Sequence, residues 1–181
     1  MERFEVCSVN FNTPDLLERL LQSIRAFSDI QVRIIDGSNT EEFQRLAKEI
    51  CQKYNADIVQ LGYNIHHGRG LDYAISSSTF DWVLCVDSDA ELLPGIFECL
   101  KFTHFIEGFA YDVGFCPDYV HPEFILVNVP KYKVSKVKFT HHGAPAVHVN
   151  ESKDKLCTDK AGLKYFIRHG RGTCYRFGYA L

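Results

Sequence analysis

Two carboxylates one residue apart follow a strand-like stretch within the segment Asp81 to Leu92. The apolar run from Trp82 to Val86 contains β-branched and aromatic residues, and Asp87-Ser88-Asp89 comes directly after it. Like charges this close raise each other's pKa unless a cation lies between them, and hard divalent cations such as Mg²⁺ and Mn²⁺ prefer carboxylate oxygens. The alternative is an acidic turn, because Asp and Ser are ordinary turn residues.

The elements that would position this acidic pair alternate between strand and helix. Strand-like segments are followed by amphipathic or capped helical segments along the first half of the chain, with strands expected over 5–11, 32–35, 57–61 and 82–86. This alternation predicts an α/β fold with a mainly parallel, doubly wound sheet. Such sheets bind ligands beyond the carboxyl ends of their strands, where Asn12, Asp36 and Asn64 would join the acidic pair.

Capping and turn residues in the sequence predict where several helices and strands begin. Thr13 is expected to cap a helix that has Pro14 at its first position, and a second helix is expected to begin near Glu41 with acidic residues in its first turn. A further helix is expected after Pro94. Beyond it the sequence predicts an irregular, strand-rich half, with strands over 108–115, 124–129 and 134–139.

Composition excludes several classes of protein. The 181 residues are 46% hydrophobic and 24% charged with a net charge of −3, which predicts one globular domain without a bulk affinity for nucleic acid. The charged N-terminus and the lack of a long apolar run predict a cytoplasmic protein with no transmembrane segment, although peripheral membrane association stays open. The seven cysteines contain no Cys-X-X-Cys pair and are interpreted as reduced, with Cys7 and Cys85 in the core.

Four stretches in order resemble family 2 glycosyltransferases, which have the GT-A fold of nucleotide-diphospho-sugar transferases. The stretches are Val6–Asn12 with its following helix, Ile34–Ser38, Asn64–Ile75 and Trp82–Asp89. A looser similarity covers Tyr165–Gly170. The resemblance implies a single GT-A-like domain over 1–181, with a nucleotide-sugar-binding half at 1–92 and an acceptor-binding half at 93–181.

The resemblance also implies roles for individual residues. Asp89, Asp87 and His169 would hold a divalent metal, Mn²⁺ or Mg²⁺, with Asp87 facing either the ribose or a metal-bound water. The expected contacts to the nucleotide sugar are Phe11, Asn12, Asp36, Asn64, Arg69, Asp72, Asp87 and Ser88. Asp36 departs from the family spacing, which usually has one more residue before the Ser.

The catalytic base is the clearest departure from the family. Larger members carry a Glu-Asp pair downstream of the Asp-X-Asp motif, and no such dipeptide follows Asp89 here. Glu151 and Asp154, in the acceptor half, are the candidates for this base.

The function that these features predict is metal-dependent, inverting transfer of a sugar from a nucleotide-diphospho-sugar to a glycan or another hydroxyl acceptor. The first alternative is a binding module of the same fold that has lost catalysis. A second is a phosphatase of the haloacid-dehalogenase type, in which Asp87 would be the nucleophile. In such enzymes, however, the motif normally opens the domain, whereas here three strand-like segments precede it.

Overall fold

The structure is a computed structural model, which describes residues 3–111, 119–135, 138–139, 165–169, 174–177 and 179–180. Side chains are described for residues 3–108, 123–135, 138 and 139. The predictions made for Glu151, Asp154 and the side chain of His169 therefore concern residues or side chains that the structure does not describe.

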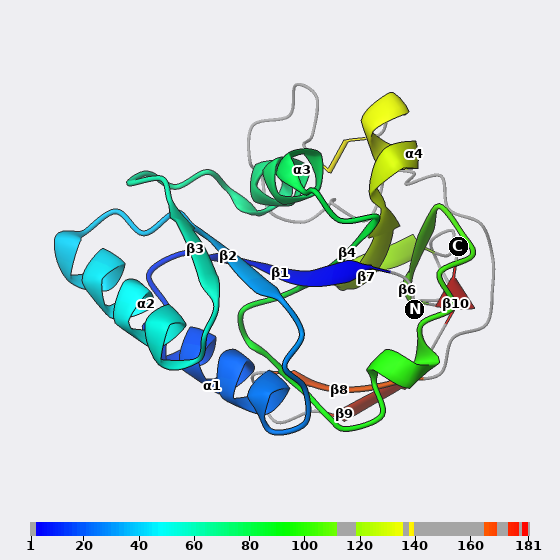
Figure 1. Ribbon diagram of the computed structural model, residues 1–181, viewed down its shortest axis with the longest axis horizontal. Coiled ribbons are helices and arrows are strands. Elements are labelled where there is room, and N and C mark those ends of the chain that lie inside the picture. The colour runs from blue at the N-terminus through cyan, green and yellow to red at the C-terminus, as the bar shows by residue number, and fades with distance from the viewer. Residues whose placement is uncertain are drawn as a thin grey trace.

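A seven-stranded sheet forms the centre of the molecule (Figure 1). Its order is β10-β6-β7-β4-β1-β2-β3, and the four strands β4, β1, β2 and β3 run parallel while β7 is antiparallel to β4. The bounds are Phe4–Asn10 for β1, Val32–Asp36 for β2, Asp57–Gln60 for β3, Trp82–Val86 for β4, Ile106–Tyr111 for β6, Tyr119–Asn128 for β7 and Tyr179–Ala180 for β10. The parallel strands are those that the alternating pattern predicted.

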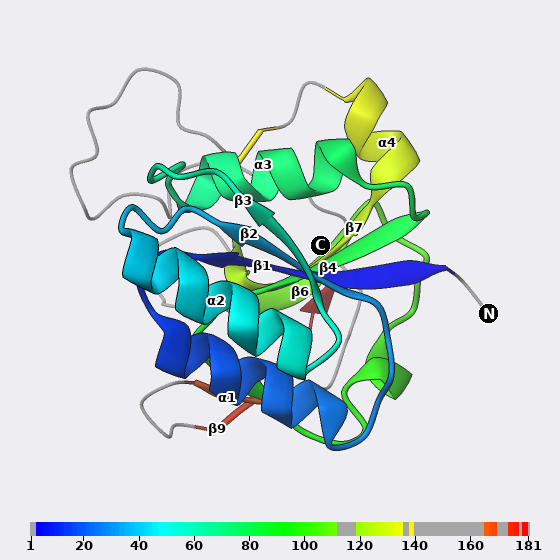
Figure 2. The same ribbon diagram turned by 60° about the vertical axis from the view of Figure 1, so that its left-hand side comes forward.

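Helices cover both faces of this sheet (Figures 1 and 2). Helices α1 (Pro14–Arg25) and α2 (Glu41–Lys53) lie on one face, and α3 (His67–Ser77) and α4 (Val129–Val134) lie on the other. Alternate side chains of a strand point to opposite faces of the sheet and pack into two separate hydrophobic cores. Val6 packs in the core under α1 and α2, and its neighbour Cys7 packs in the core under α3 and α4. Two hydrophobic layers therefore pack the sheet between the helix pairs.

A second, three-stranded sheet has the order β5-β8-β9. It pairs β5 (Ala90–Leu92) with β8 (Tyr165–His169) and β8 with β9 (Cys174–Phe177), all antiparallel. Because β5 follows β4 after only three residues, the acidic pair lies in the turn that joins the two sheets.

Three local expectations differ from the structure. Only a 3-10 turn, Phe97–Cys99, follows Pro94, because Gly95 adopts a φ of +89° that no helix accommodates. The strand expected over 134–139 is wrong at its start, because Val134 is the last residue of helix α4. Asn128 caps the beginning of this helix by accepting a hydrogen bond from Lys131 N. Thr13 does occupy the N-cap of α1, but its hydroxyl donates to Asn10 Oδ1 at 2.8 Å and makes no cap.

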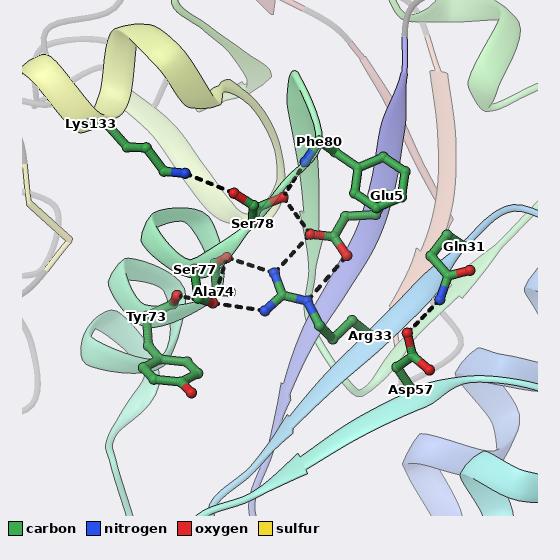
Figure 3. Close-up of polar contacts among 10 residues, drawn as sticks. All are labelled: Glu5, Gln31, Arg33, Asp57, Tyr73, Ala74, Ser77, Ser78, Phe80 and Lys133. Atoms are coloured by element: carbon green, nitrogen blue, oxygen red, sulfur yellow. Dashed lines mark hydrogen bonds and ion pairs between the residues drawn. The ribbon is translucent and has the colours of Figure 1, made fainter.

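A buried charge network anchors the far end of α3 (Figure 3). Arg33 on β2 makes a fork to Glu5 on β1 at 2.7 and 3.1 Å and donates to Ala74 O at 2.7 Å. Ser78 Oγ donates to Glu5 Oε1 at 2.6 Å, and Lys133 on α4 donates to Ser78 O at 2.7 Å. The network joins both helices of this face to the amino ends of the parallel strands.

The cysteines whose side chains the structure describes, Cys7, Cys51, Cys85 and Cys99, are free thiols. Cys7 and Cys85 are buried core residues, as predicted, and burial raises the pKa of both thiols. Desolvation also raises the pKa of Cys51 to about 12. Among the residues that the structure describes, no helix is both long and apolar enough to cross a bilayer.

Candidate active site

Polar residues end the parallel strands at one edge of the sheet. Asn10 at the end of β1 lies in register with Asp36 at the end of β2, and Asp36 lies in register with Gln60 of β3. Their side chains are linked, because Asn10 Nδ2 donates to Asp36 Oδ1 at 2.9 Å and Gln60 Nε2 donates to Asp36 Oδ2 at 3.3 Å. The edge is therefore a connected polar layer.

Asp36 is fully buried in this layer. Its Oδ1 also accepts from Ser38 Oγ at 2.6 Å and from Ser38 N at 3.2 Å. Hydrogen bonds of this kind stabilise an ionised carboxylate away from water. In the structure Asp36 fixes the loop after β2.

The loops after β1 and β2 are clamped together by two asparagines. Asn12 Nδ2 donates to Asn39 Oδ1 at 2.9 Å, and Asn39 N donates to Asn12 Oδ1 at 3.2 Å. Asn12 N also donates to Ser38 Oγ at 3.0 Å, and Asn12 has a φ of +57°, which Asn tolerates better than most residues. This clamp leaves the Phe11 side chain 37% exposed at the sheet edge.

The loop after β3 approaches the loop after β2 closely at Gly37. A Cβ at that position would lie 3.0 Å from Tyr63 O and 3.3 Å from Ile65 N, so only glycine fits there without a shift of backbone. Asn64 Oδ1 accepts from His66 N at 2.8 Å and shapes the entry to α3. Tyr63, which is 58% exposed, thus lies on a loop that contacts the Asp36 loop.

Helix α3 begins at this same edge. A Cβ on Gly70 would lie 2.7 Å from both methyl carbons of Val9, so the glycine allows α3 to pack directly against β1. His66, before the helix, has φ +64° and ψ +153°, a conformation that is strained for any residue except glycine. Arg69 is exposed on the first turns of the helix.

Asp72 on α3 points to the second half of the chain. Its Oδ1 accepts a short hydrogen bond from the Tyr132 hydroxyl and a 2.8 Å bond from Phe139 N. Tyr132 is buried and stacks on Phe139, with ring centroids 6.0 Å apart. Asp72 therefore joins α3 to α4 and to the segment at 138–139.

The Asp-X-Asp motif lies in the turn after β4. Asp87 N donates to Glu123 O on β7 at 3.0 Å, and Ala90 N donates to Asp87 O at 3.1 Å. Ser88 and Asp89, within this turn, are half-buried. The turn is thus held by β7 on one side and closes into β5 on the other.

Asp87 Oδ1 lies 3.4 Å from His67 Nε2, at the start of α3. Both atoms are buried, and neither forms a hydrogen bond. A buried polar atom without a partner is uncommon and is characteristic of positions that a ligand or ion completes. Sequence reasoning missed His67, although its place in the stretch Asn64–Ile75, soon after the third strand-like segment, could have placed it at this edge.

The residues present fit a divalent cation at this turn. The orphaned oxygen of Asp87 and the carboxylate of Asp89 are hard donors, and β8 brings the backbone of His169 into register with Ala90, the residue after Asp89. Among the side chains that the structure describes, no group of three or more His, Cys, Asp or Glu residues is arranged to hold a metal. The described side chains would therefore hold a cation only together with groups beyond them or with the ligand itself.

The sequence profile described as glycosyl transferase family 2 matches residues 5–180. The match spans nearly the whole chain, including the strands that form the polar edge and the Asp-X-Asp turn. The chain belongs to glycosyl transferase family 2. The curated proteins compared with this family 2 chain include no significant match.

Solved glycosyltransferases share the fold of this family 2 chain. A mannosyltransferase from Pyrobaculum calidifontis, in complex with GDP-Man and Mn²⁺, superposes with a TM-score of 0.55 at 14% identity over 71% of this chain and 45% of its own. TarS 1–349 of S. aureus gives 0.57 at 16% identity over 81% and 52%. The galactosyltransferase LgtC, in complex with donor and acceptor sugar analogues, gives 0.54 at 14% over 71% and 59%.

These likenesses establish the GT-A fold that the sequence predicted. The aligned part of this chain spans between about half and three fifths of each of the three solved chains.

Proposed function

We propose that this protein transfers a sugar, with inversion, from a nucleotide-diphospho-sugar to a hydroxyl acceptor at the carboxyl edge of its sheet. The observation that carries the proposal is the Asp-X-Asp turn at the exit of β4 in a family 2 chain, with a buried Asp87 oxygen that lacks a hydrogen bond. The mannosyltransferase complex with GDP-Man and Mn²⁺ supports a donor of this chemical class.

The polar edge would orient the donor. Phe11, which is partly exposed, would offer an aromatic face to the nucleobase, and Asn12 and Asn64 would shape the pocket through the hydrogen bonds with which their amides hold the loops after β1 and β3. Asp36 would act mainly by fixing Asn10 and Ser38, since its own carboxylate is fully buried. Arg69 and Ser88 would contribute donors to the phosphate oxygens.

Asp87, Asp89 and His169 would hold the cation, Mn²⁺ or Mg²⁺. A divalent cation bound there supplies positive charge that stabilises the departing nucleoside diphosphate. The turn after β4 keeps both carboxylates at the sheet edge, because its backbone is tied to β7 and β5. Asp72, which accepts from Tyr132 and Phe139, would keep α3 and the second half of the chain in a fixed relation around the donor.

A carboxylate in the acceptor half would take the proton from the acceptor hydroxyl. A general base of this kind contributes roughly 10²–10⁴-fold to the rate. Glu151 and Asp154 stay the predicted candidates.

The decisive experiment compares Asp89→Asn with the wild-type protein in a hydrolysis and transfer assay with nucleotide sugars and Mn²⁺. Loss of a carboxylate that holds the cation should lower turnover by at least about 100-fold while the far-UV circular dichroism stays unchanged. Glu91→Gln is the matched control, because Glu91 lies two residues further on, in β5, and its carboxylate lies 3.9 Å from the guanidinium of the half-exposed Arg19. Turnover of Asp89→Asn equal to wild type contradicts the metal assignment.

The same assay tests the alternative of a binding module. That alternative is favoured by the absence of a Glu-Asp pair after Asp89. Binding of a nucleotide sugar without hydrolysis or transfer, with glycan acceptors present, would replace the transferase proposal by the binding module.

A further inference from the structure

The contact between His67 and Asp87 joins helix α3 to the turn after β4. The expected metal ligands include Asp87 of this turn but no residue of α3. His67 opens α3, and Asp87 opens the turn after β4. Gly70 lets α3 lie against Val9 of β1, the strand next to β4, and this close packing brings the first turn of the helix to the end of β4. The juxtaposition is therefore built into the fold.

The geometry of the pair differs from that of a hydrogen bond. The Nε2 and Oδ1 atoms are 3.4 Å apart, which is close enough for an ion pair, yet neither atom has a hydrogen-bond partner and both are buried. Two ligands of one cation, each about 2.1 Å from it at a right angle, lie about 3 Å apart. A shared cation would sit beside the line between the two atoms and would satisfy both.

We propose that His67 is a ligand of the divalent cation that Asp87 holds. The inference rests on the proposed function for the identity of the site, and it adds an imidazole nitrogen from α3 to the Asp87 carboxylate. Imidazole suits Mn²⁺ and other first-row metals better than it suits Mg²⁺, which favours oxygen ligands. The site should therefore select Mn²⁺ over Mg²⁺.

Mn²⁺ alone is the probe for the first test, with binding measured from the EPR signal of the free ion. His67→Ala should weaken Mn²⁺ binding roughly tenfold or more, since even residues that only support a metal ligand are worth 10–100-fold. His66→Gly is the matched control: it removes the neighbouring exposed imidazole and suits the positive φ at that position, so affinity should stay within about twofold. His67→Gln, which keeps a similar length, guards against a folding defect and should weaken binding too.

An unchanged or higher Mn²⁺ affinity in His67→Ala overturns the inference. If His67 only pairs with Asp87 as an imidazolium, it competes with the cation, and His67→Ala will bind Mn²⁺ as tightly as wild type or more tightly.

The second test detects the nitrogen directly. In a His169→Ala background, the electron spin echo of bound Mn²⁺ should still show coupling to an imidazole ¹⁴N, and adding His67→Ala should remove it. Bound Mn²⁺ without this coupling in His169→Ala overturns the assignment. Wild-type protein that binds no Mn²⁺ overturns both the assignment and the metal site, whereas Mn²⁺ bound with ¹⁴N coupling but without sugar transfer contradicts only the proposed function.

Discussion

Buried charged residues lie at both ends of the parallel strands, and different interactions compensate their charges at the two ends. At the carboxyl end, Asp36 is held by hydrogen bonds from Asn10, Ser38 and Gln60, which fix the loops after β1 and β2. At the amino end, Glu5 is 3% exposed and depends on the guanidinium of Arg33. The first arrangement shapes the site, and the second holds the helices that frame it.

Arg33→Met tests the second arrangement. It leaves Glu5 buried without its cation, so the free energy of unfolding should fall by about 3–5 kcal/mol, as measured by urea denaturation. Arg45→Met is the control, because Arg45 and Glu49 form an exposed pair on α2 that should contribute no more than about 1 kcal/mol.

The double variant Glu5→Gln with Arg33→Met should recover part of the loss, because the uncompensated charge is gone. Equal losses for Arg33→Met and Arg45→Met would contradict a structural role for the buried pair.

At the scale of elements, α3 contacts three separate parts of the molecule. Its first residue, His67, faces Asp87, while Asp72 in its middle bonds to Tyr132 of α4. Its last turn accepts from Arg33 through Ala74 O. A small displacement of α3 would therefore disturb both the contact of His67 with Asp87 and the hydrogen bond of Asp72 with Tyr132.

Gly70→Ala should produce such a displacement. The added methyl group would meet Val9, whose branched side chain cannot swing away, and overpacking of this kind costs about 1–3 kcal/mol, partly offset by better helix propensity. We expect a lower midpoint of urea unfolding and weaker Mn²⁺ binding.

Ser76→Ala, on the exposed side of the same helix, should instead raise stability by a few tenths of a kcal/mol. A Gly70→Ala protein as stable as Ser76→Ala, with unchanged Mn²⁺ binding, would show that α3 need not lie so close to β1.

At the scale of the whole molecule, the sheet edge belongs to residues before Leu92, but later residues complete its surroundings. The strand β7 borders β4, and β8 pairs with β5 directly after the acidic turn. The proposed donor half at 1–92 and acceptor half at 93–181 are therefore not separate structural units, since both sheets contain strands from each half.

Donor binding should stabilise the whole molecule. A nucleotide sugar present with Mn²⁺ at about 100 times its Kd should add about 2.7 kcal/mol to the free energy of unfolding, since ligands that bind only the folded state stabilise it. Thermal unfolding with UDP, GDP, dTDP and CMP sugars should show one preferred nucleotide, and its shift should shrink in Asp89→Asn. Unchanged melting with all four donors would contradict donor binding.

The sequence by itself determined the order of elements and the edge at which the site lies. Hydrophobic periodicity and turn residues determine local structure within a few neighbouring positions, and such signals can be read from the sequence. The parallel strands, the acidic first turn of α2 and the Asp-X-Asp turn were therefore predictable. Local reasoning failed where one backbone angle decided the outcome, as at Gly95 after Pro94.

The tertiary structure decided which polar groups meet. The approach of His67 to Asp87 depends on how closely α3 packs on β1, and the direction of Asp72 depends on where α4 places Tyr132. Burial of Asp36 likewise follows from three strand ends and their loops closing over it. Such contacts join residues far apart in the chain, and their distances are set by side-chain volumes across the whole core, which no short sequence pattern encodes.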